Sequence, residues 1–134
     1  MPVQWTVSHP TRLIVAVARG DIGLADIEEY LDDVVAKNIL PYRKIFDLTH
    51  ATPKLDDDAL MALGARIRAY RALGRIGPLA IVATTQESHE QAQIFAALAE
   101  ANRPIQIFRA LYDARRWLDD LAGDAPGEVG KPAL

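Results

Sequence analysis

The plainest structural signal in the chain is the segment Leu79-Ala80-Ile81-Val82-Ala83-Thr84-Thr85-Gln86-Glu87. Its first five residues are apolar, which is typical of a strand at the centre of a sheet that is covered on both faces. The next four resemble a capping box, in which threonine and glutamate side chains satisfy the free N–H groups at the start of a helix. The segment therefore predicts a buried strand that leads directly into a helix, the unit of an α/β fold.

The same order of strand and helix recurs on both sides of this segment. Residues 44–48 predict a short strand before a helix that begins near Asp56, and residues 105–108 predict another strand before a closing helix. A helix over residues 24–37 comes before them. The predicted buried faces follow a period of 3.6 residues: Leu24, Ile27, Leu31, Val34 and Val35; Leu60, Leu63, Ile67 and Tyr70; Ala92, Phe95, Leu98 and Ala99; Leu111, Ala114, Leu118 and Leu121.

The chain begins with a predicted hairpin. Residues 3–8 alternate between apolar and polar, and residues 13–18 form an almost wholly apolar run. The turn between them, at residues 9–12, is so short that the two strands must be antiparallel. We therefore expect an α/β domain with a mixed sheet of about five strands, an antiparallel hairpin followed by largely parallel strands, and four helices.

Length and composition fit one ordinary domain. The chain has 134 residues, a quarter of them charged, and no linker that would divide it. We expect the domain to span residues 1–122 and the glycine- and proline-containing residues 123–134 to form a flexible tail.

The chain contains no cysteine, which excludes disulfides and thiolate chemistry. A net charge of −3 argues against nucleic-acid binding. No secretory signal or run long enough to span a membrane is seen, so a cytoplasmic location is expected.

Polar residues follow two of the predicted parallel strands. Asp47, Thr49 and His50 come after one strand, and Thr84 and Thr85 come after the next. In open α/β sheets ligands bind beyond the carboxyl ends of the strands, so these residues form a candidate ligand crevice. The simpler interpretation is that the threonines cap a helix and that the histidine is a solvated loop residue.

No enzyme activity, cofactor or metal is expected. His50 with Asp47 would suit a hydrolase, but no serine lies in a glycine-flanked nucleophile turn. The three histidines, His9, His50 and His89, lack the spacing of metal ligands, and the glycine motifs that cradle nucleotide phosphates are absent. A receiver-like phosphotransfer domain is not expected either, because the acidic cluster that holds magnesium in phosphoryl transfer is missing.

Arg68, Arg71 and Arg75 have the spacing of a row along one side of the second predicted helix. Such a row is a candidate anion-binding face for a phosphate, an acidic lipid head or an acidic partner. Its simpler interpretation is a solvated helix surface.

The order of elements and two segments resemble the STAS domains, the anti-sigma-factor antagonist-like or SpoIIAA-like group, in a divergent bacterial branch. The segments are Ile45-Phe46-Asp47-Leu48-Thr49 and Phe108-Arg109-Ala110-Leu111-Tyr112-Asp113-Ala114-Arg115-Arg116-Trp117-Leu118. The resemblance covers about residues 3–122. It implies a small non-catalytic module that binds a protein partner or a small ligand.

In regulatory members of this group a partner kinase phosphorylates a hydroxyl residue in a segment of the form hydrophobic-Asp-Ser-Ser/Thr-Gly-Leu. The matching segment here is Leu55-Asp56-Asp57-Asp58-Ala59-Leu60. Asp56 matches the aspartate of the group, but Asp57 and Asp58 stand in place of hydroxyl residues, and a carboxylate does not accept the phosphate. Helix capping and the helix dipole also explain the three aspartates.

The leading hypothesis is a non-catalytic regulatory or protein-interaction module without the phosphorylation switch. Its expected partner surface is the start of the helix at Asp56, Asp57 and Asp58, and its partner is a protein. The alternative is a small-molecule or lipid carrier that uses the crevice at the strand ends. An enzyme ranks last. The edge of the opening hairpin also makes a homodimer an expectation.

Overall fold

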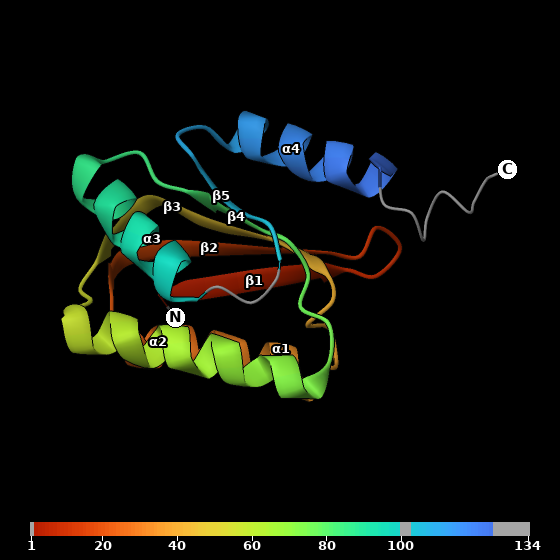
Figure 1. Cartoon of the computed structure of the whole chain (residues 1–134). Coiled ribbons are helices and arrows are strands. Elements are labelled where there is room, and N and C mark those ends of the chain that lie inside the picture. Colours follow the sequence, from red (N-terminus) through yellow and green to blue (C-terminus); the bar gives the residue numbers. More distant parts are fainter. Residues whose placement is uncertain (1, 100–102, 125–134) are drawn as a thin grey trace, which may run out of the picture.

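The computed structural model describes residues 2–99 and 103–124. In these residues it forms five strands and four α-helices, which match the predicted number and order (Figure 1). The elements are β1 (Val3–Ser8), β2 (Leu13–Ile22), α1 (Leu24–Ala36), β3 (Arg43–Pro53), α2 (Asp57–Ala69), a 3-10 turn (Tyr70–Leu73), β4 (Leu79–Val82), α3 (Gln86–Leu98), β5 (Ile105–Phe108) and α4 (Leu111–Asp124).

The strands lie side by side in chain order, β1-β2-β3-β4-β5. β1 pairs antiparallel with β2, from Val3 opposite Ala18 to Ser8 opposite Leu13. The other three pairs, β2 with β3, β3 with β4, and β4 with β5, are parallel. The predicted mixed sheet is confirmed.

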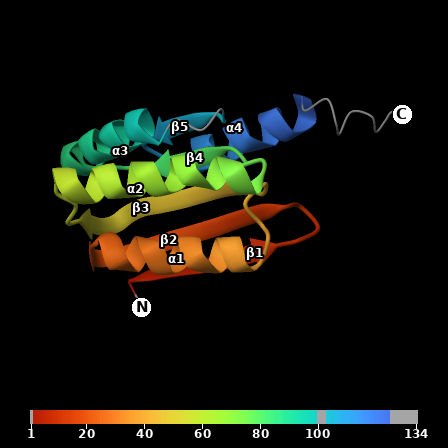
Figure 2. The same cartoon turned by 60° about the horizontal axis from the view of Figure 1, so that its bottom comes forward.

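The chain order of the parallel strands fixes the side on which the helices lie. Crossovers between parallel strands are right-handed, so successive strands added in one direction place their helices on the same face. α1, α2 and α3 cover one face of the sheet and α4 covers the other (Figures 1 and 2). The middle of the sheet is thus covered on both faces, and all four residues of β4 are buried as the apolar pattern predicts.

Each face of the sheet has its own apolar core. The larger core lies under the three helices and includes Ile14, Val34, Leu63 and Ile81. The smaller core lies under α4 and consists of Leu13, Ile45, Ala80, Val82, Ala114 and Leu118. Neighbours along a strand, such as Ala80 and Ile81, belong to different cores, because successive side chains of a strand point to opposite faces.

β2 and β3 are longer than the sequence predicts. The predicted strands end at residues 18 and 48, but Arg19 pairs with His50 and Ile22 pairs with Pro53, after a register shift in β2. Arg19, Gly20, Asp21 and Thr52 are exposed. These added residues show little of the apolar pattern that identifies a buried strand in a sequence. They form strands because the backbones of β2 and β3 pair with each other there.

Two helices also end at other residues than expected, since Gly74 and Gly77-Pro78 predict the end of the second helix and the tail is predicted from residue 123. α2 ends at Ala69 and passes into the 3-10 turn before Gly74, whose φ of 131° an L side chain rarely adopts. α4 extends to Asp124, so the first two residues of the predicted tail are helical. Residues 125–134 of that tail lie outside the described residues.

Candidate functional site

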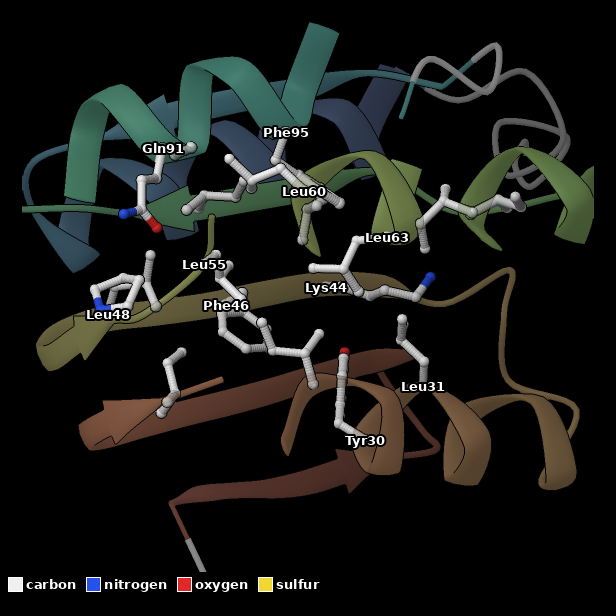
Figure 3. A pocket seen from close by; sticks show the side chains of 18 of the residues that line it. Tyr30, Leu31, Lys44, Phe46, Leu48, Leu55, Leu60, Leu63, Gln91 and Phe95 are labelled. Carbon is white, nitrogen blue, oxygen red and sulfur yellow. The ribbon is translucent and has the colours of Figure 1, made fainter. Parts of the chain in front are cut away.

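A cavity of about 90 Å³ lies between the sheet and the three helices that cover its larger core (Figure 3). Its walls come from β2, β3 and β4 on one side and from α1, α2 and α3 on the other. Almost all of the wall is apolar. The polar residues of the wall are Tyr30, Lys44, Gln91 and Arg103.

The strand period explains how β3 places a lysine in this wall. Lys44, Phe46 and Leu48 alternate along β3 and therefore face the same side of the sheet, towards the helices (Figure 3). Ile45, between them, faces the opposite core. α1 contributes Tyr30 in the same way, through the helical spacing that also places Ile27 and Leu31 in the cavity wall.

Tyr30 brings a buried hydroxyl group to the cavity. The residue is 3% exposed, and its ring makes edge contacts with Trp5 and Phe46 at centroid distances of 5.3 and 5.5 Å. No hydrogen-bond partner of the hydroxyl oxygen is found among the described residues. Burial raises the pKa of Tyr30, and the positive charge of Arg103 opposes that change in part. The hydroxyl is therefore a protonated donor without an acceptor.

Lys44 is 4% exposed, which is rare for a lysine. Its Nζ donates hydrogen bonds to the carbonyl oxygens of Leu40 and Tyr42, the latter at 2.7 Å. Burial, and secondly the positive charge of Arg103, lower the pKa of Lys44 to about 6. At neutral pH the amine is therefore mainly uncharged, and its two N–H groups match the two carbonyls.

Arg103 precedes β5 and reaches the cavity from the side. Its Nη1 donates to the carbonyl oxygen of Gly77 at 3.0 Å, while its buried Nε has no acceptor among the described residues. Burial lowers the pKa of Arg103 to about 10, and Tyr30 opposes that change, so the guanidinium stays charged at neutral pH. Gln91 of α3 adds a third unpaired buried atom, Oε1. No aspartate or glutamate is among the described residues that line the cavity.

A second hollow, of about 460 Å³, adjoins the cavity. It is lined by Arg71, Arg75 and Arg103 together with apolar residues. Arg103 and Ile76 belong to the walls of both spaces. The hollow therefore places two more basic side chains at the outer side of the cavity, next to Arg103.

The three arginines proposed from the sequence are only partly brought together here. Arg71 lies in the 3-10 turn and Arg75 lies beyond Gly74, so the three do not form a row on one helix. Arg68 donates to the carbonyl of Leu98 on α3 and does not line the hollow. Arg71 and Arg75 share the hollow with Arg103, which the sequence pattern did not select.

The residues of the predicted crevice lie outside the cavity wall. Asp47, Thr49 and His50 are inside β3, which continues to Pro53. Asp47 Oδ1 accepts hydrogen bonds from the N–H of Thr49 at 2.9 Å and from its hydroxyl at 2.5 Å. Thr84 is exposed, and Thr85 accepts from the N–H of Ser88 as the cap of α3. Among the described residues no hydrogen bond joins the two groups, and none of the five residues lines the cavity.

Asp56, Asp57 and Asp58 occupy the exposed start of α2. Asp56 is the cap, and its Oδ1 accepts from the N–H of Ala59 at 2.8 Å. Asp57 and Asp58 follow in the first turn, where the helix dipole favours negative charge. Local helix chemistry thus accounts for all three aspartates.

Two further features are absent from the described part of the chain. No group of three or more histidine, aspartate or glutamate side chains is arranged to hold a metal ion there. Within the same residues, no helix is long and apolar enough to cross a membrane.

Sequence reasoning missed Tyr30, Lys44, Gln91 and Arg103 as site residues. For Lys44 a signal existed, because it shares the strand face of Phe46 and Leu48. Tyr30 likewise lies three residues after Ile27 and four before Val34 on the predicted apolar face of α1. Arg103, next to Pro104 before the last strand, gave no comparable signal.

Comparison with known proteins is informative for the fold. No protein-family model matches the chain, and no curated protein matches its sequence. A solved structure of an uncharacterized protein of the DUF3478 family from Shewanella loihica PV-4, described as having a SpoIIAA-like fold, matches with a TM-score of 0.57 and 14% identity over 87% of this chain and 93% of its own. The anti-sigma factor antagonist SpoIIAA in its unphosphorylated form matches with a TM-score of 0.57 and 11% identity over 90% of this chain and 98% of its own.

These likenesses show that the chain has a SpoIIAA-like fold, so the resemblance to STAS domains is confirmed at that level. At 11–14% identity, what the structures share is the fold alone.

Proposed function

We propose that this protein is a non-catalytic ligand-binding domain that holds a small, mainly apolar molecule between the sheet and α1, α2 and α3. The observation that carries the proposal is the apolar cavity with three buried polar atoms that lack partners among the described residues: Tyr30 Oη, Gln91 Oε1 and Arg103 Nε. This is the carrier alternative of the sequence analysis, moved from the strand ends to the helix-covered face.

The energetics favour an occupant. Each unpaired buried polar atom costs about 1–3 kcal/mol, and protein interiors otherwise contain few voids larger than a water molecule. A ligand that fills the cavity and pairs these atoms recovers both costs. Binding sites are typically apolar hollows with a few converging polar groups, which is the composition found here.

The residues considered for catalysis do not take part in this site. Asp47 is engaged by Thr49, and His50 is exposed on β3. Neither residue lines the cavity. This supports binding without chemistry as the role of the domain.

Filling the cavity tests the proposal. Ala92 of α3 is 4% exposed and lines the cavity, whereas Ala97 of the same helix is exposed. Native mass spectrometry of the freshly purified protein detects a bound molecule, and a titration with hexanol followed by NMR measures binding of a neutral apolar probe. Wild type and Ala97→Leu are expected to bind, and Ala92→Leu is expected to lose binding while staying folded. Equal binding by the two leucine variants, or none by wild type, would contradict a ligand in this cavity.

A protein-interaction role on the outer side of α2 is the second candidate. Asp57 and Asp58 are exposed there, and Met61 is 58% exposed one turn later. Acidic residues beside an exposed apolar side chain suit a partner with a basic rim, and SpoIIAA, which shares the fold, is an anti-sigma factor antagonist. The cytoplasmic location and the homodimer expected from the sequence stay predictions.

Substitution at the expected partner surface tests this second role. Asp58→Lys and Asp58→Ser are compared with Asp120→Lys on α4, which is also exposed. Partners captured from cell extract by wild type and by Asp120→Lys should be lost with Asp58→Lys and retained in part with Asp58→Ser. Unchanged capture by Asp58→Lys would show that the start of α2 is not the partner-binding surface.

A further inference from the structure

We infer that the cavity selects a small aliphatic or aromatic carboxylic acid, whose carboxylate accepts hydrogen bonds from the Tyr30 hydroxyl and the Arg103 guanidinium. The apolar part of the ligand then lies along Phe46, Leu48 and Leu55. This inference rests on the proposed ligand-binding function and names the chemistry of the ligand.

Two of the three unpaired atoms are donors and favour an acceptor, whereas the third, Gln91 Oε1, is itself an acceptor that a carboxylate does not pair. Tyr30 Oη and Arg103 Nε are both buried, both lack a partner among the described residues, and both line the same cavity. Figure 3 shows the Tyr30 side chain directed from α1 into the cavity. The two residues are close enough for the charge of Arg103 to act on the pKa of Tyr30. A neutral apolar ligand would leave both donors unpaired, whereas a carboxylate has lone pairs for both.

The charges of the cavity wall also favour an anionic ligand. Two basic side chains, Lys44 and Arg103, and no acidic one are among the described residues of the cavity wall. A buried cation without a counter-charge is costly. Lys44 avoids this cost at neutral pH because its lowered pKa leaves it uncharged, but Arg103 stays charged. The described residues of the cavity wall therefore supply no negative charge next to Arg103, and an anionic ligand would supply one.

The adjoining hollow explains how an anion reaches this position. Arg71 and Arg75 line the hollow on the outer side of Arg103. Three basic side chains of one sign attract an anion and orient its acid end towards Arg103. The ligand thus enters with its apolar end first and keeps its carboxylate at the side of the hollow.

Size limits the apolar part of the ligand. A dry engineered cavity of about 150 Å³ binds benzene, and the cavity here measures about 90 Å³. Because this cavity is smaller than the one that binds benzene, it accommodates a short aliphatic chain, and a single-ring acid also needs the part of the adjoining hollow next to Arg103. Long acyl chains require the helices to move away from the sheet.

The test compares an acid with its neutral counterpart, hexanoate with hexanol, by isothermal titration calorimetry at neutral pH. Wild type should bind hexanoate at least tenfold more tightly than hexanol. Tyr30→Phe and Arg103→Met should each weaken hexanoate binding more than hexanol binding, so that this preference falls severalfold. Arg103→Lys, which keeps the charge, should retain part of the preference. Arg109→Met serves as the control, because Arg109 is exposed outside both spaces.

Each outcome separates this inference from the proposed function. If hexanol binds as tightly as hexanoate, or if Tyr30→Phe and Arg103→Met keep the full preference for the acid, the carboxylate inference is overturned and the apolar site stands. If neither probe binds to folded wild type, both proposals fail. Thermal unfolding of each variant identifies any that does not fold, and Tyr30→Phe, which removes one oxygen atom, keeps the test available if Arg103→Met unfolds.

Discussion

The Nζ of Lys44 lies 2.7 Å from the carbonyl oxygen of Tyr42, two residues earlier, at the end of the loop before β3. With a second bond to the carbonyl of Leu40, the amine completes the hydrogen bonding of the loop that leads into β3. The lysine thus has a structural role in addition to lining the cavity. Because its pKa is lowered, Lys44 should change how the free energy of unfolding depends on pH.

Lys44→Met is expected to change the pH dependence of stability. In the folded protein Lys44 holds its proton only below about pH 6, whereas in the unfolded chain it does so up to 10.5. Between these values the unfolded chain binds more protons, so this residue makes the free energy of unfolding rise with pH, by at most about 1.4 kcal/mol per unit. The variant loses this rise, so its stability relative to wild type should fall as pH increases.

Urea unfolding at several pH values between 6 and 10 measures this difference. Lys54→Met is the matched control, because Lys54 is exposed. Parallel pH profiles for wild type and Lys44→Met would show that Lys44 is not buried as described.

Trp5→Phe tests the link between β1 and α1. Trp5 Nε1 donates to Asp33 Oδ2 at 2.7 Å, and this bond, followed by that from Lys37, lowers the pKa of Asp33 below 3.8. Loss of a bond to a carboxylate at a half-exposed site should cost about 1–2 kcal/mol at neutral pH. Because the folded pKa is depressed, this stability is present above pH 3.8 and is lost as pH falls through the folded value. The difference from wild type should therefore narrow in acid, whereas Trp117→Phe, on the other face of the sheet, should show no such narrowing.

Asp56→Ala distinguishes capping from the general effect of acidic residues. Asp56 bonds the N–H of Ala59, so its loss should lower the free energy of unfolding by about 1 kcal/mol. Asp57→Ala removes a charge from the first turn without removing the cap and should cost less. Chemical denaturation measures both variants, and equal losses would argue against the cap.

Gly64→Ala tests the close contact between α2 and α3. A Cβ at Gly64 would lie 2.7 Å from Leu98 Cβ and 3.0 Å from the Leu98 backbone. The overlap should destabilise the protein by about 1–3 kcal/mol, although alanine is the better helix former by about 1 kcal/mol. Ala65→Gly, at an exposed position of the same helix, measures that propensity difference alone. A Gly64→Ala protein more stable than wild type would contradict the close packing.

The elements of the fold were predictable because apolar periodicity and capping residues are local signals. The buried strand β4 and the Thr85 cap of α3 lie where the pattern indicates. The extension of β2 and β3 was not predictable, because polar residues such as Asp21 and Thr52 pair there without an apolar pattern. The predicted crevice places Asp47, Thr49 and His50 at the end of a strand, whereas β3 continues to Pro53.

The local sequence determined which residues form strands and helices, and which face of each element is apolar, because these follow from neighbours a few residues apart. The cavity was decided only by the tertiary structure. Tyr30, Lys44 and Arg103 come from α1, from β3 and from the segment before β5, and they meet because three crossovers place their helices on one face of the sheet. Whether the space between them is filled depends on the volumes of side chains from at least six elements. The total volume of these side chains cannot be read from any periodicity along the chain.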